Sequence, residues 1–216
     1  MAQAATADAS AQGRIRLENT EKILQAAEKV FAEHGFRGAT TAAIAAEAGL
    51  PKANIHYYFG TKAKLYRAVL DDILALWLSS FGDISAADDP KETLTRYIQA
   101  KMRLSKERPD ASKVFANELI RGAPRIHEHL STDLKDWVEE KAAIFDGWAQ
   151  EGKITPVDGR RLLFHIWAMT QTWADFGAQW TAVLGRKNGL TDADFDVATT
   201  AVITTVLRTC GLETDQ

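Results

Sequence analysis

A run of aromatic and basic residues in the first third of the chain carries side chains that suit contact with phosphate and with flat polar rings. His56, Tyr57, Tyr58 and Phe59 are consecutive, and Lys62 follows closely. Because a helix turns by about 100° per residue, consecutive aromatic side chains cannot all face one core. Some of them must point toward solvent or a partner, where their N–H and O–H groups can reach phosphates and base edges.

A second group of residues, far from the first in the sequence, could hold a small molecule. Trp77, Trp167 and Gln171 combine two indoles with an amide, and Trp167 and Gln171 share one face of a helix because they are four residues apart. Burial of an amide is costly unless it has a hydrogen-bond partner. A flat heterocycle with C=O and N–H groups could be that partner and could also stack on an indole. Lys101 could donate to a ligand carbonyl. The alternative is that both tryptophans are core residues and that Gln171 and Lys101 reach solvent.

The remaining reactive side chains do not indicate an enzyme. The five histidines form no pair with metal-ligand spacing beside a carboxylate, Cys210 has no evident base, and no glycine-rich phosphate loop occurs. We therefore expect no catalytic residue, no metal and no cofactor. A single cysteine fits a reducing compartment, and no apolar run reaches the ~18 residues that span a bilayer. We expect a cytoplasmic protein that does not bind membranes.

Charge is distributed unevenly along the chain. The net charge of −3 over 216 residues argues on its own against nucleic-acid binding. Residues 1–65, however, carry eight Lys or Arg against six Asp or Glu, a surplus of two positive charges, and the rest of the chain carries a net −5. A weakly basic segment joined to an acidic one suits a protein that contacts phosphate at one end only.

Helices must position these side chains, because apolar residues recur with helical spacing nearly everywhere and no long alternating segment occurs. We expect an all-α protein with about nine helices, several of them opened or ended by Pro or Gly. Their approximate ranges are 20–36, 40–48, 51–59, 62–81, 90–107, 110–121, 125–150, 160–184 and 192–209.

The second and third of these helices form a helix-turn-helix pattern, in which the second helix of the pair enters the major groove of DNA. With Ile55 and Phe59 facing the core, the polar and aromatic residues of 52–58 lie on the other sides. Asn54 could pair with adenine and Lys52 with guanine or phosphate. The same pattern also occurs at ordinary helical corners, so the residues alone leave both interpretations open.

The segments around this pattern resemble the N-terminal domain of TetR-family transcriptional regulators. They read ILQAAEKVFAEHGF and TTAAIAAEAGLPKANIHYYFGTKAKLY. Pro51 departs from the family, which often has Ser or Thr at this position. His56 departs as well, because Tyr is common there. The resemblance implies that Thr41, His56, Tyr57, Tyr58 and Lys62 hold the DNA backbone and that Lys52, Ala53 and Asn54 meet or flank base edges. With Thr40, these residues form the expected DNA-binding set.

The rest of the chain resembles the pyrimidine-utilisation regulators of that family, which sense uracil and thymine. The matching segments are LALWLSSF, YIQAKMRLS, FANELIRGAP, LKDWVEEKAAIFDGWAQEGKITPVD and FHIWAMTQTWADFGAQ. The resemblance implies that Trp77, Trp167 and Gln171, with Lys101, bind a uracil-like or thymine-like effector. Trp173 stands where a smaller aromatic is expected. Two alternatives remain: a related regulator of an unrelated metabolite, and an all-α adaptor without DNA binding.

The expected organisation is a flexible N-terminal arm at 1–16, a three-helix helix-turn-helix domain at 17–65 and an effector-binding and dimerisation domain at 66–216. Short recognition helices bind specifically when two copies reach successive major grooves about 34 Å apart, so we expect a homodimeric repressor of a palindromic operator. The helices at 160–184 and 192–209 are apolar on more than one face. They form the expected dimer interface, the alternative being that they are simply core helices.

Overall fold

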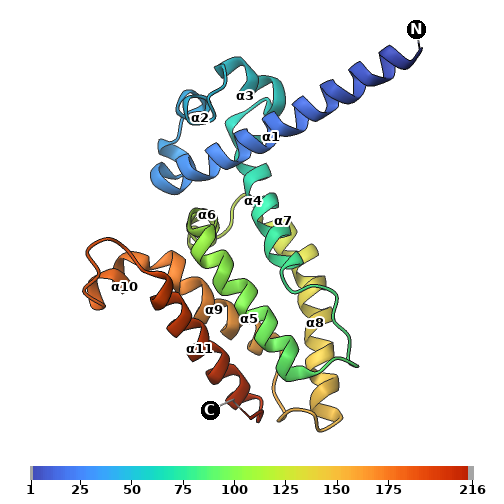
Figure 1. The fold of residues 1–216 in the computed structure, drawn as a ribbon, viewed down its shortest axis with the longest axis vertical. Helices are drawn as coiled ribbons and strands as arrows, with labels where there is room; N and C mark the ends of the chain where they lie inside the picture. Colours follow the sequence, from blue (N-terminus) through green and yellow to red (C-terminus); the bar gives the residue numbers. More distant parts are fainter. Residues whose placement is uncertain (1, 214–216) are drawn as a thin grey trace. The chain divides into compact units, whose positions relative to one another are not determined.

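The structure, a computed structural model, describes residues 2–213, and all regular elements among them are helices (Figure 1). The expected all-α class is therefore confirmed. The bounds of the eleven helices are α1 Ala2–Gly38, α2 Thr41–Glu47, α3 Lys52–Phe59, α4 Lys62–Ser79, α5 Pro90–Glu107, α6 Pro109–Ile120, α7 His127–Ser131, α8 Asp133–Gln150, α9 Gly159–Asp175, α10 Gly177–Val183 and α11 Asp192–Thr209.

The helix count exceeds the expected nine because each of the two longest expected helices is broken once. The segment 125–150 separates into α7 and α8 at Thr132, whose φ and ψ are −116° and −89°. The segment 160–184 separates into α9 and α10 at Phe176, whose φ and ψ are −113° and 30°. Apolar spacing continues across both breaks, so the sequence pattern predicted single helices.

The flexible arm at 1–16 stays a prediction. Its described residues, from Ala2 onward, belong to α1. Alanine, the strongest helix former, is frequent in these residues. At the other end of α1, Gly35 has φ 63° and ψ 173°, which interrupts the helix where the sequence predicted its end. Residue 1 and residues 214–216 of the expected domains lie outside the described part of the chain.

The chain divides into two compact units, Met1–Ile73 and Leu74–Gln216, whereas the expected boundary fell between residues 65 and 66. Unit 1 contains α1, α2, α3 and the first part of α4. Its core is formed by buried apolar side chains from all four helices, among them Ile23, Phe31, Ile44, Ile55 and Leu65. Gly49, at φ 64°, makes the turn between α2 and α3, a conformation that glycine adopts without steric cost.

Unit 2 contains the rest of α4 and the helices α5 to α11. Helix α5 packs against both α9 and α11, and α8 packs on α9. The core between them contains Leu94, Ile98, Phe145, Trp148 and Leu163, all fully buried. Side-chain caps fix where the main helices begin, because Asp89, Asp158 and Thr191 accept hydrogen bonds from the first turns of α5, α9 and α11. These helices form the frame of a cavity in unit 2.

Candidate functional site

The expected recognition helix α3 presents most of its polar side chains to solvent. Ile55 is fully buried and anchors the helix in unit 1. Lys52, Ala53, His56 and Tyr57 are exposed, whereas Asn54 and Tyr58 are half-buried. This distribution matches the faces expected from the sequence. The exposed face carries one ammonium, one imidazole and one phenol, groups that suit phosphate and base-edge contacts.

Two side chains of α3 are held by hydrogen bonds within unit 1. The amide nitrogen of Asn19, on α1, donates to the hydroxyl oxygen of Tyr58 at 3.2 Å. The Nδ1 of His56 donates to the carbonyl oxygen of Gly60 at 3.0 Å, because a carbonyl can only accept. The Tyr58 ring is therefore fixed against α1, and the His56 ring is fixed across the end of α3. Their remaining donor groups have a defined direction.

Lys62 is tied to the backbone of unit 1. Its ammonium donates to the carbonyl oxygens of Phe36 and Ala39, both at 2.8 Å, and lies 4.8 Å from the centre of the Phe36 ring. These carbonyls follow the break at Gly35, where the helix no longer supplies donors. Two of the three N–H groups of Lys62 are thereby used inside the protein, and at most one can reach a DNA phosphate.

The two threonines before α2 have different positions. Thr40 caps α2, since its hydroxyl oxygen accepts a hydrogen bond from the backbone N–H of Ala43 at 3.1 Å. Thr41 is the first residue of α2 and is half-buried. Helix α2 therefore begins at a defined residue, which sets the position of the following turn and of α3.

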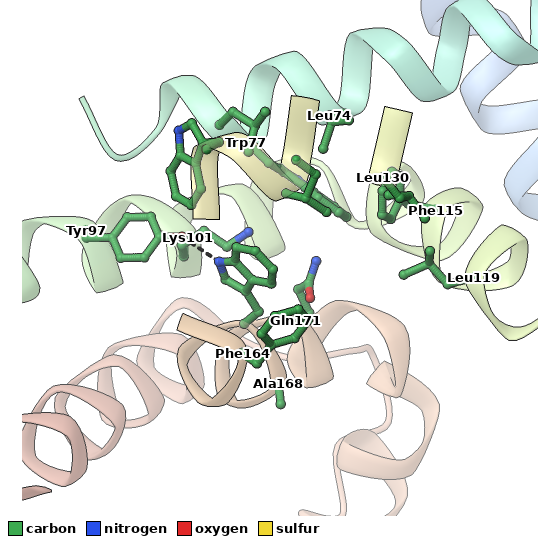
Figure 2. A pocket seen from close by; sticks show the side chains of 14 residues that line it. Leu74, Trp77, Tyr97, Lys101, Phe115, Leu119, Leu130, Phe164, Ala168 and Gln171 are labelled. Atoms are coloured by element: carbon green, nitrogen blue, oxygen red, sulfur yellow. Dashed lines mark hydrogen bonds between the residues drawn. The ribbon is translucent and has the colours of Figure 1, made fainter. Parts of the chain in front are cut away.

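All four expected effector-binding residues line one cavity of about 430 Å³ in unit 2 (Figure 2). Trp77 comes from α4, Lys101 from α5, and Trp167 and Gln171 from α9. In Figure 2 the Gln171 amide points from α9 toward the space between α4 and α5. Ligand cavities in proteins are mostly apolar with a few converging polar groups, and this one has that composition.

Lys101 is the charged residue of the cavity wall and is 3% exposed. Its ammonium lies 4.6 Å from the centre of the Trp77 ring. Burial lowers the pKa of this ammonium from 10.5 to about 7, and the carboxylate of Asp175 opposes that shift. In the described part of the chain, no hydrogen bond or ion pair engages Lys101 Nζ. A ligand acceptor could therefore pair with it.

Tyr97 is a polar residue of the cavity that the sequence analysis missed. Its hydroxyl oxygen accepts a hydrogen bond from Trp167 Nε1 at 2.6 Å, so its own proton can be donated to an acceptor in the cavity. Burial raises the pKa of this phenol, which keeps the proton on the oxygen. The spacing could have indicated Tyr97, because it precedes Lys101 by one helical turn.

Aromatic and aliphatic side chains complete the wall, and sequence reasoning had not assigned them to the site. Phe115 packs edge-on against Trp77, with ring centres 4.7 Å apart, and Phe164 lies 4.9 Å from Trp167. The other apolar residues of the lining are Leu74, Leu78, Leu119, Leu130, Leu134, Trp137 and Ala168. Each fits a helical core pattern equally well, so the sequence offered no signal that separated cavity wall from core.

Comparisons with known proteins identify the family of both units. Residues 23–69 match the family model described as bacterial regulatory proteins of the tetR family, and residues 70–213 match the model of the C-terminal region of YcdC-like proteins. The chain belongs to the TetR family of bacterial transcriptional regulators. It is a regulator that binds DNA and not an enzyme, and members of this family bind operator DNA as dimers and respond to small molecules.

One relative supports the same assignment, and two solved structures share the fold. The chain is 38% identical to the HTH-type transcriptional regulator RutR of Escherichia coli K12 over 185 residues, which cover 86% of this chain and 87% of RutR. Its fold is similar to that of a transcriptional regulator, SCO4942, from Streptomyces coelicolor, with a TM-score of 0.69 and 23% identity over 87% of this chain and 96% of the other. A structure of AibR with isovaleryl coenzyme A and operator DNA gives a TM-score of 0.67 at 19% identity, covering 87% and 97%.

The described residues lack the features of a metal site and of a membrane span. In the described part of the chain, no group of three or more His, Cys, Asp or Glu side chains could hold a metal ion. Among the same residues, no helix is both long enough and apolar enough to cross a bilayer.

Proposed function

We propose that this chain is a cytoplasmic repressor whose dimer releases a palindromic operator when a uracil-like or thymine-like pyrimidine occupies the cavity of unit 2. One observation carries the effector part of this proposal. Trp77, Lys101, Trp167 and Gln171, which resemblance to pyrimidine-sensing regulators singled out, come from three helices and line one cavity. The similarity to RutR over most of both chains supports the same assignment.

The polar groups of the cavity fit the edge of such a ring. A uracil ring offers two C=O acceptors and two N–H donors in its plane. Lys101 and Tyr97 can each donate to a ring oxygen, and the Gln171 amide can donate and accept at once. The indoles of Trp77 and Trp167 provide flat apolar surfaces for the faces of the ring. The ring thus satisfies polar groups that are otherwise costly in an apolar cavity.

On the DNA side, the exposed face of α3 is proposed to enter the major groove. Lys52, Ala53 and Asn54 lie at the start of the helix, where recognition helices meet base edges. Tyr57, Tyr58 and His56 are proposed to contact the phosphate backbone, with Thr40 and Thr41 at the start of α2. Lys62 is proposed to contribute mainly by fixing the turn after α1 and, with its remaining N–H, by contacting phosphate.

Helix α4 gives a covalent connection between the two activities. Its first part belongs to unit 1, and from Leu74 onward it belongs to unit 2, where Trp77 lines the cavity. We propose that the protein has two conformations, which differ in the position of this helix and in operator affinity. A ligand that binds one of them more tightly raises its population and so changes operator affinity. The change equals the difference between the affinities of the ligand for the two conformations.

The proposal is tested by operator binding with and without pyrimidine. Duplexes selected by the protein from a random pool provide the operator, and fluorescence anisotropy measures affinity. We expect millimolar uracil to lower the affinity at least about tenfold, and the Trp167→Phe variant to need more uracil for the same effect. Trp173→Phe, on the same helix but outside the cavity lining, serves as the control and should respond like the unchanged protein.

Failure has a clear form in this experiment. If uracil and thymine leave operator affinity unchanged at every concentration, the pyrimidine assignment is wrong and an unrelated metabolite takes its place. If no duplex is selected and binding to DNA shows no dependence on salt, the DNA-binding face of α3 is wrong as well, since phosphate contacts release counterions.

A further inference from the structure

The cavity of unit 2 has a polar end and an apolar end. Its polar groups, Lys101, Gln171 and the hydroxyl of Tyr97, come from α5 and α9. In Figure 2, Tyr97 and Lys101 lie on one side of the cavity and Leu130, Phe115 and Leu119 on the opposite side, with Gln171 between the two groups. The apolar end carries no polar side chain in the cavity lining. The two ends therefore suit different parts of one ligand.

The volume of the cavity exceeds what a bare pyrimidine ring fills. A space of about 430 Å³ corresponds to the liquid volume of roughly fourteen waters at about 30 Å³ each. A single six-membered ring with two oxygens is smaller than that. A ring placed against Lys101 and Gln171 leaves the apolar end in contact with water, so burial of that apolar surface contributes nothing to affinity.

The apolar end also reaches the surface of unit 2. Leu119, on α6, lines the cavity at this end and is 44% exposed. Leu130 and Leu134, from α7 and α8, also line the cavity and are half-buried. An apolar substituent that extends from the ligand ring toward this end would cover these side chains. The contacts at the polar end would stay the same.

We propose that the cavity takes a uracil-type ring that carries an apolar substituent of a few carbon atoms on a ring carbon. The oxygens and N–H groups of the ring pair with Lys101, Tyr97 and Gln171, and the substituent lies between Phe115 and Leu119. The inference rests on the proposed function, because it uses the same cavity and the same ring. It adds the class of pyrimidine that fits best.

The test compares affinities of the full-length protein by isothermal titration calorimetry. The probes are uracil, thymine and two propyl-substituted uracils, one with the chain on each of the two ring carbons that can carry it. Each methylene that leaves water contributes about fourfold in affinity. We therefore expect at least one propyl compound to bind between about tenfold and about sixtyfold more tightly than uracil, and to release the operator at correspondingly lower concentration.

A matched pair of variants locates the substituent. Leu119→Trp fills the apolar end with a larger side chain at a partly exposed position, so it should bring the ratio of propyl-compound affinity to uracil affinity down to about one. Ile120→Trp changes the next residue, which is 78% exposed and outside the cavity lining, and should keep the advantage.

Each remaining outcome counts against a definite claim. If uracil binds and neither propyl compound binds more tightly, the inference is overturned and the proposed function stands. If the propyl compounds gain affinity equally in both tryptophan variants, the substituent does not lie at Leu119 and the inference is overturned. If no uracil compound binds at all, the pyrimidine assignment and the inference fail together.

Discussion

At the scale of single residues, Lys62 has a structural role in unit 1 in addition to the phosphate contact that its residue type suggests. A lysine after a recognition helix favours a phosphate contact, and resemblance to the TetR family implied one. In the structure its ammonium donates to two backbone carbonyls beyond the break in α1. A buried carbonyl that loses its donor costs about 1–3 kcal/mol. Lys62 thus stabilises unit 1 whether or not it also contacts DNA.

Replacement of Lys62 separates these roles. We expect Lys62→Met to lower the free energy of unfolding by roughly 1–3 kcal/mol, because the carbonyls of Phe36 and Ala39 lose their donor. Urea denaturation followed by circular dichroism measures the change. Lys64→Met, at an exposed lysine of the same helix, is the control and should change stability by less than about 0.5 kcal/mol. Equal stability of both variants would mean that Lys62 acts on DNA alone.

Lys101 links the cavity to pH. Its folded pKa of about 7 lies below its ordinary value of 10.5, so the unfolded chain binds the proton more tightly between these two pH values. Lys101 therefore contributes a rise in the free energy of unfolding with pH through that window, and the cost of burying its ammonium is fully present below about pH 7. Above about pH 9 the buried thiol of Cys210, whose pKa burial raises to about 11, opposes this rise. A ligand oxygen that accepts from the ammonium has the opposite effect, since it raises the pKa of Lys101.

Two results follow for a variant without this charge. Lys101→Met should be more stable than the unchanged protein at pH 6 to 7 and should lose the rise of stability toward alkaline pH. It should also bind uracil more weakly, while the unchanged protein binds uracil less tightly as pH rises above about 7. Denaturation and calorimetry at a series of pH values measure both. Arg103→Met, at an exposed position of α5, should alter neither slope; a pH-independent stability of the unchanged protein would contradict the burial of a charge.

Sequence reasoning found the cavity residues whose polar groups are unusual for a core. An amide and an ammonium on apolar helices, such as Gln171 and Lys101, require a partner if they are buried, but they can equally reach solvent, so it was the resemblance to pyrimidine-sensing regulators that singled them out. Tyr97, Phe115 and Phe164 could not be predicted, because an aromatic side chain on an apolar face fits a core as well as a cavity. Whether packing leaves a space beside such a residue depends on helices distant in the sequence.

At the scale of helices, the contact of α8 with α9 depends on one residue without a side chain. Gly159 begins α9 and is buried, and a Cβ added there would lie 2.7 Å from the carbonyl oxygen and 2.9 Å from the Cα of Ala142, on α8. Both atoms belong to the backbone of α8, so they cannot move aside alone. The two helices carry Trp137, Trp167 and Gln171 of the cavity wall.

We expect Gly159→Ala to lower the free energy of unfolding by roughly 1–3 kcal/mol through overpacking, despite the higher helix propensity of alanine. The helices must separate by a fraction of an ångström, so uracil affinity should fall as well. Urea denaturation and calorimetry check the two effects. Gly147→Ala, within α8 and with open space around its Cβ position, is the matched control and should be neutral or stabilising. A neutral Gly159→Ala would show that α8 and α9 pack less closely than described.

Helix positions could be predicted where capping residues and glycines mark the ends. Asp158 and Thr191 cap α9 and α11 at the expected starts, and Gly49 makes the expected turn before α3. The break at Thr132 has no adjacent glycine or proline, whereas Gly177 directly follows Phe176 at the other break, a local signal that the sequence analysis did not use. They arise from packing within unit 2, which apolar spacing along one helix does not describe.

At the scale of the whole molecule, exposed apolar residues near the C-terminal helices indicate where two copies meet. Phe176, Val183 and Leu184 lie on or beside α10, and Val197 lies on α11; each is between 41% and 73% exposed. Single exposed apolar residues are common, but such a group on neighbouring segments favours a protein interface. We propose that α9 and α11, with α10, form the dimer contact, which would bury these side chains.

A charge at Val197 tests this interface and the dependence of DNA binding on it. In a two-fold symmetric contact the same residue of both copies lies near the axis or faces the same patch, so Val197→Glu places two like charges in a surface that loses water. We expect the dimer dissociation constant to rise at least about a hundredfold, roughly 3 kcal/mol, as measured by sedimentation equilibrium, with the helical circular dichroism unchanged. Operator affinity should fall as well, and the slope of log affinity against log salt concentration should approach half of the value for the unchanged protein, because one copy contacts half of the phosphates.

The control is Ala143→Glu, at an exposed position on α8, which adds the same charge and should leave both the dimer dissociation constant and the salt slope unchanged. A Val197→Glu protein that remains dimeric at nanomolar concentration would place the interface on other helices.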